Sequence, residues 1–146
     1  MRSDSGELSL AATLLDGLIA GASLNRTIVE LPAFRRIGAD AWATYSRNAD
    51  LRNGRFWYPA LAIAGTALTM AAAIGNRNLR PAAGLAMLGL ASTALAGPNV
   101  LRVRRVEPAD VVRSSFDRFR RWQAVRSTLQ GLAFAAAIAA LWRARR

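Results

Sequence analysis

The side chains that can do chemistry in this sequence are carboxylates and arginines placed inside apolar segments. The chain has no cysteine and no histidine, which excludes disulfides, thiol catalysis, zinc fingers and Ser-His-Asp hydrolysis, and removes the usual haem ligands. The carboxylates are few and scattered, so we expect no metal site and no cofactor. The ionisable groups inside apolar segments are Asp16, Arg26, Glu30 and Arg126.

Polar residues gather along one side of the helix predicted for Leu8–Phe34. At 100° per residue, one narrow face holds Ser9, Asp16, Ser23, Thr27 and Glu30, with Thr13 and Arg26 at its edges. A charge facing lipid at a helix centre costs about 2.5–3.5 kcal/mol on insertion scales, so this face should meet protein or a wet cavity. For Asp16, near mid-membrane, we expect either a functional role or a specific interhelical bond.

Four apolar segments predict the architecture. They cover approximately residues 8–34, 56–75, 79–98 and 123–142. A membrane-spanning helix needs about 20 residues, so each segment can cross a bilayer once. We therefore predict an all-α fold, a four-transmembrane-helix antiparallel bundle that forms a single domain over residues 1–146. Gly97 and Pro98 should end the third span.

Two long linkers separate the spans, and each contains a helix signal. In the first linker, Asp40 is a suitable N-cap, and Trp42, Tyr45 and Ala49 then share a face, as expected for an interfacial helix. In the second, Pro108 marks a helix start that should run on into the fourth span. The connection between the second and third spans is a tight turn.

The charge pattern favours a membrane over nucleic acid as the partner. The formal charge is +11 and all 20 basic residues are arginine, mostly between and after the apolar segments. The long linkers carry twelve arginines against six on the opposite side. We therefore expect a protein of the bacterial inner membrane, with the long linkers in the cytoplasm and both termini outside.

Polar and aromatic groups should converge at the end of the bundle where the long linkers lie. We expect Glu30 and Arg126 to lie within salt-bridge distance. Alternatively, Arg26 and Glu30 neutralise each other at i, i+4, and Arg126 extends to the headgroups. Each aromatic side chain, Trp42 included, fits an interfacial belt when taken alone. The candidate ligand-binding residues at this end are Arg26, Trp57, Tyr58, Asn99, Trp122, Gln123 and Gln130.

Short motifs along nearly the whole chain resemble one family. The first span ends in Leu31-Pro32-Ala33-Phe34, the first linker carries Trp42, Tyr45 and Asn48, the third span ends in Pro98-Asn99, and the fourth is entered through Trp122-Gln123-Ala124-Val125-Arg126. This layout resembles the anthrone-oxygenase-like family of small four-helix membrane proteins. That family often has a histidine where this chain has Gln123.

The resemblance implies cofactor-free oxidation of a polycyclic aromatic, such as an anthrone, to a quinone. An anthrone is a carbon acid whose enolate reacts directly with dioxygen. The resemblance would make Glu30 or Asp16 the base and Arg126 the group that stabilises the enolate. Asn99 or Gln123 would bond the carbonyl, and Trp57, Tyr58 and Trp122 would stack on the rings.

A non-catalytic role is the alternative that the sequence leaves open. Small residues are frequent in the spans, and Gly17 and Gly21 form a GxxxG pair that permits close helix approach. Such faces serve either packing within the chain or association with a second copy. A subunit that packs against a larger membrane protein would need only these faces and the basic linkers.

Overall fold

The computed structural model describes residues 2–144, with side chains from residue 6 onward; Arg145, Arg146 and the side chain of Arg2, which enter the orientation count, lie outside the described part. The elements in chain order are α1 (Arg2–Asn25), the π-helical turn η1 (Arg26–Glu30), α2 (Leu31–Ile37), α3 (Ala39–Asn48), α4 (Gly54–Gly75), the 3-10 turn η2 (Arg77–Leu79), α5 (Arg80–Arg102) and α6 (Ala109–Ala144). The prediction of an all-α fold is confirmed.

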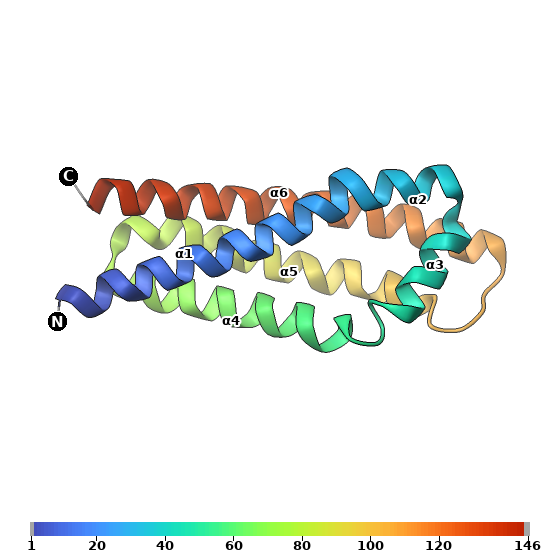
Figure 1. The fold of residues 1–146 in the computed structure, drawn as a ribbon, viewed down its shortest axis with the longest axis horizontal. Coiled ribbons are helices and arrows are strands. Elements are labelled where there is room, and N and C mark those ends of the chain that lie inside the picture. Colours follow the sequence, from blue (N-terminus) through green and yellow to red (C-terminus); the bar gives the residue numbers. More distant parts are fainter. Residues whose placement is uncertain (1, 145–146) are drawn as a thin grey trace.

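Four segments of the described chain are long and apolar enough to cross a membrane, which is the architecture of a multi-pass membrane protein. They are Gly6–Ile37, Gly54–Gly75, Arg77–Arg102 and Ala109–Ala144. α1 contacts α4 and α6, and α5 contacts the same two helices, with its largest interface against α6. The helices therefore form a closed antiparallel bundle. In Figure 1 the α4–α5 turn lies at one end and both long linkers lie at the other.

The first span changes its hydrogen-bond pattern just before Pro32. Pro32 has no N–H to donate to the carbonyl of Ile28, and its ring would crowd that carbonyl. The preceding turn is π-helical, and the N–H of Leu31 bonds to the carbonyl of Arg26, five residues back. π-helical turns often occur at functional sites, and this one carries both Arg26 and Glu30.

The prediction that Gly97 and Pro98 end the third span is wrong. α5 continues through Pro98 for a further turn. The side-chain Nδ2 of Asn99 donates to the carbonyls of Leu95, at 3.0 Å, and Ala96, at 3.3 Å. Both bonds lie in the turn that contains Pro98, whose missing N–H leaves the carbonyl of Ala94 without its helical donor.

The helix predicted in the first linker forms as α3, and its apolar face packs on protein. Trp42 is fully buried, with its ring centroid 5.3 Å from that of Phe116 and 5.5 Å from that of Phe119, both in α6. The belt role is therefore wrong for Trp42. The physical reason is the length of α6. Its first turns extend beyond the start of α4 and give α3 an apolar surface to cover (Figure 1).

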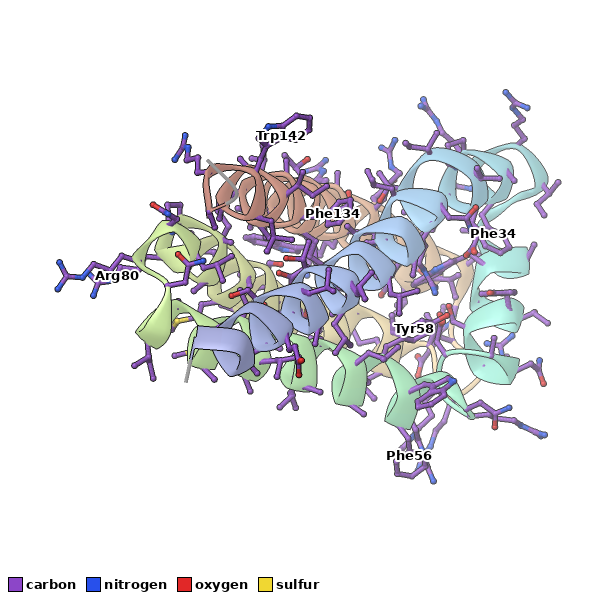
Figure 2. The ribbon with its side chains drawn as sticks, turned by 60° about the vertical axis from the view of Figure 1, so that its left-hand side comes forward. Phe34, Phe56, Tyr58, Arg80, Phe134 and Trp142 are labelled. Carbon is purple, nitrogen blue, oxygen red and sulfur yellow. The ribbon has the colours of Figure 1, made fainter. Side chains whose placement is uncertain are left out.

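The two glycines of the GxxxG pair have different surroundings. A Cβ on Gly17 would lie 2.9 Å from the ring of Phe134, so the glycine allows α1 and α6 to approach closely. Phe134 lies on the side of α6 that faces α1 (Figure 2). A Cβ on Gly21 would meet nothing within 4 Å. Close packing within the chain therefore involves Gly17 and not Gly21.

Replacement of Trp42 by alanine should destabilise the protein strongly. The substitution Trp42→Ala removes a fully buried indole from between two phenylalanine rings, and such truncations cost about 3–5 kcal/mol in the free energy of unfolding. The exposed Trp142 provides the control, and Trp142→Ala should change stability by less than about 0.5 kcal/mol. Denaturant unfolding in detergent micelles measures both. Similar small effects would show that α3 is not anchored as described.

Candidate functional site

A cleft lies between α1 and α4 near the long-linker end of the bundle. Its volume is about 170 Å³, and its walls come from α1, η1, α4, α5 and α6. Figure 2 shows Tyr58 between α1 and α4, whereas Phe56 points away from the bundle. The candidates that the cleft brings together are Arg26, Glu30, Tyr58, Arg126 and Gln130.

Arg26 forms a buried ion pair with Asp50, at the end of the first linker. Its Nη1 donates to Oδ1 of Asp50 at 2.6 Å, and its Nη2 donates to Oδ2. Both side chains are less than 10% exposed. A bidentate pair of this kind neutralises a charge that would otherwise be costly inside an apolar bundle.

Asp50 is the residue of this site that the sequence analysis missed. Backbone bonds from the N–H of Leu51 to the carbonyl of Ser46, and from Gly54 to Ala49, hold its loop, each at 2.9 Å. The available signal was slight: a single carboxylate at the end of an arginine-rich linker. Its partner Arg26 is 24 positions away in the sequence, too far for helix periodicity to relate the two.

The expected ion pair between Glu30 and Arg126 does not form in the described structure. Glu30 accepts a hydrogen bond from Nδ2 of Asn25 at 3.0 Å, and Arg126 donates to Oε1 of Gln123. Both side chains line the same cleft, but neither belongs to an ion pair. Arg26 and Glu30 form no ion pair either, because Asp50 binds both terminal nitrogens of the Arg26 guanidinium.

Hydrogen bonds join the first span to α6 beside the cleft, from the last residues of α1 and from η1. The Nε2 of Gln123, which is fully buried, donates to the carbonyl of Ser23 at 3.3 Å. The hydroxyls of Thr27 and Ser127 bond at 3.0 Å. Gln123 therefore binds α1 with its amide nitrogen and orients Arg126 with its amide oxygen, although it does not line the cleft itself.

Several buried polar atoms around the cleft lack a hydrogen-bond partner. Eight such side-chain atoms occur in the described part of the chain, and four belong to residues that line this cleft. These four are Arg26 Nε, Glu30 Oε2, Arg126 Nε and Gln130 Oε1. Buried polar groups are normally satisfied, so a cluster of exceptions around one cavity indicates a place for a bound group or water.

Asp16 lies outside the cleft. It is 5% exposed and accepts a hydrogen bond from the hydroxyl of Thr69 in α4 at 3.0 Å. Of the two roles left open for it, the structure therefore shows the interhelical bond. Among the described side chains, which begin at residue 6, no group of three or more acidic residues gathers closely enough to hold a metal ion.

Three other candidates do not line the cleft. Trp57 and Trp122 lie on the outer surface, with Trp57 67% exposed. Asn99 is buried, and its amide serves the carbonyls of its own helix. Tyr58 is thus the aromatic side chain that lines the cleft. Gly54 makes room for it, since a Cβ there would come within 2.9 Å of the Tyr58 ring.

Tyr45 of α3 and Phe119 of α6 shield the ion pair. The guanidinium carbon of Arg26 lies 5.7 Å from the ring centroid of Tyr45 and 5.2 Å from that of Phe119. Partial burial raises the pKa of the Tyr45 phenol; the nearby carboxylates of Glu30 and Asp50 act in the same direction, and Arg26 opposes them. The phenol is therefore neutral at physiological pH.

Comparison of the chain with protein-family models, with curated proteins and with solved structures finds no match in any of the three. The function is therefore inferred from the chemistry of the cleft.

Loss of Asp50 should leave the protein much less stable. In Asp50→Ala, the buried guanidinium of Arg26 has no carboxylate, and breaking a buried pair in this way costs about 3–5 kcal/mol in the free energy of unfolding. The exposed pair of Asp117 with Arg120, 3.8 Å apart, is the matched control, and Asp117→Ala should cost less than about 1 kcal/mol.

The double variant Arg26→Met/Asp50→Ala tests whether the cost comes from the unpaired charge. Removing both charges should recover most of the stability lost in Asp50→Ala, because no buried ion is left uncompensated. Additive losses in the double variant, measured by unfolding in the same micelles, would contradict this account of the pair.

Proposed function

We propose that this membrane protein binds an apolar weak acid in the cleft and catalyses its cofactor-free oxidation by dioxygen. The observation that supports this most directly is the cluster of unsatisfied polar atoms on Arg26, Glu30, Arg126 and Gln130, all around one cavity. A bundle packed solid at this end would instead have favoured a non-catalytic subunit.

The polar groups in the cleft suit a ligand that both donates and accepts hydrogen bonds. Glu30 Oε2 and Gln130 Oε1 need donors, and Arg126 Nε needs an acceptor. The charges of Glu30 and Arg126 balance before a ligand arrives, so the ligand would enter neutral. A neutral weak acid fits, because its proton can pass to Glu30 while the anion that remains stays beside Arg126.

The chemistry proposed for an anthrone balances without a cofactor. Glu30 removes a proton from the ring CH₂, and Arg126 stabilises the enolate oxygen. The carbanionic carbon transfers electrons to O₂ and forms a C–O bond, and the resulting peroxide takes the proton back from Glu30. Loss of water from the hydroperoxide forms the second carbonyl, so anthrone and O₂ give anthraquinone and water.

Oxygen uptake and quinone absorbance with anthrone as the substrate test this proposal. Purified protein in micelles should accelerate both signals, and Glu30→Gln should lower kcat by about 10²–10⁴-fold, the usual contribution of a general base. Arg126→Gln should lower kcat as well. Glu7→Gln, which changes an exposed carboxylate of α1, should leave the rate unchanged.

A wild-type rate no higher than that of the Glu30→Gln/Arg126→Gln double variant would contradict the proposed oxidation. Anthrone also oxidises slowly without protein, so this double variant supplies the background under identical micelle conditions.

We also propose that the protein lies in a bacterial inner membrane with its long linkers in the cytoplasm, on the strength of the twelve-to-six arginine distribution. Because the chain has no cysteine, single cysteines can report the orientation cleanly. A membrane-impermeant maleimide should label Asn78→Cys, in the short turn, in intact cells and should label Asn53→Cys, in the first long linker, only after lysis. The reverse pattern would reverse the orientation.

A further inference from the structure

The mouth of the cleft is apolar and lies on the outside of the bundle. Leu18 of α1 is 67% exposed there and Tyr58 of α4 is 47% exposed. Two of the four unsatisfied polar groups of the cleft belong to α6, on Arg126 and Gln130. The residues of the mouth are Leu18, Ala22, Tyr58, Pro59 and Leu61. All five belong to two of the four segments apolar enough to span a membrane, so this mouth faces the region that lipid would occupy.

The gap between α1 and α4 follows from how α1 is held. Midway along α1, Asp16 bonds to Thr69, and Ile19 packs so tightly that a Cβ on Gly65 would lie 2.6 Å from its Cδ1. Closer to the long linkers, the first span is bound to α6 instead, through the hydrogen bonds of Gln123 with Ser23 and of Thr27 with Ser127. Figure 1 shows α1 crossing obliquely from α4 towards α6, so that α1 and α4 diverge at the long-linker end.

A smaller cavity of about 80 Å³ lies beside the cleft, and residues of α5 and α6 form part of its wall. Gly97, Val100 and Phe119 line it together with the ion pair of Arg26 and Asp50. Three side chains line both spaces and separate them: Arg26, Tyr58 and Arg126.

We propose that the ligand of the cleft enters and leaves sideways, from the bilayer, through the gap between α1 and α4. This inference rests on the proposed function for the choice of ligand, and it adds the source of that ligand: an apolar weak acid already dissolved in lipid. Such a ligand would keep its apolar body against Leu18 and Leu61 while its oxygen reaches Arg126. The bilayer supplies it without passage through water.

This second cavity is less suited to an apolar ligand. Its volume is under half that of the cleft, and the route from it to the cleft passes between two arginines and a tyrosine. An apolar molecule moving past the charges of Arg26 and Arg126 would displace their polar contacts without replacing them. Water and small polar species are better suited to that side.

Association kinetics of 1-hydroxypyrene test the route. This fluorescent weak acid has an apolar polycyclic body and no reactive CH₂, so its binding is read independently of any oxidation. It is supplied in phosphatidylcholine vesicles that contain the protein, and energy transfer from the tryptophans reports binding. Ala22→Phe should narrow the mouth and slow association by about tenfold or more. Leu18→Ala should widen the mouth and speed association.

Two matched variants keep the result specific. Ala11→Phe adds the same ring to an exposed site of α1 outside the cleft. Gly97→Phe obstructs the second, smaller cavity, and a Cβ at Gly97 would meet nothing within 4 Å. Both should leave the association rate unchanged. The proposal is overturned if Gly97→Phe slows association and Ala22→Phe does not, if neither does, or if wild-type protein does not bind the probe.

Failure of the route and failure of the proposed oxidation are distinguishable. Protein that oxidises anthrone but shows no effect of Ala22→Phe on probe association would retain its proposed function and lose the lateral route. Protein that binds the probe sideways but consumes no oxygen would retain the route and lose the oxidation.

Discussion

The need to neutralise one arginine inside an apolar bundle governs the arrangement of the long-linker end. Arg26 lies in the first span with its guanidinium buried, and its counter-charge is supplied by Asp50 from the first linker. To bring Asp50 into place, the chain must leave the bundle, form α3 and return before α4 begins. The ion pair thus fixes the linker, and with it Tyr58, which follows at the start of α4.

The charges that remain unpaired are then the informative ones. Glu30 and Arg126 line one cavity, and neither belongs to an ion pair in the described part of the chain. Leaving their polar atoms unsatisfied costs stability, and folds accept such costs mainly where a ligand or reaction uses the groups. The paired arginine supports the structure, whereas the unpaired arginine and carboxylate are the groups on which the proposed ligand binding depends.

The sequence predicted the fold well, because apolar length and polar periodicity directly reflect the membrane constraint. The polar face of the first helix predicted the inward positions of Asp16, Arg26 and Glu30, which belong to a single helix. It could not predict which partner each would find. Asp50 reaches Arg26 from a loop and Thr69 reaches Asp16 from another helix, at separations that no helical period relates. The continuation of α5 past Pro98 was also hidden, because a proline in an apolar segment can either end a helix or lie within it.

Cysteine cross-linking across the cleft tests the convergence of helices α1 and α6 most directly. In a chain without natural cysteines, Glu30→Cys/Arg126→Cys should be joined within one chain by a short bismaleimide. The pair Ile28→Cys/Arg126→Cys, with Ile28 66% exposed and outside the cleft, should not be. An intramolecular cross-link confined to the first pair is the predicted result. Equal cross-linking of both pairs, or none in the first, would contradict a shared cleft.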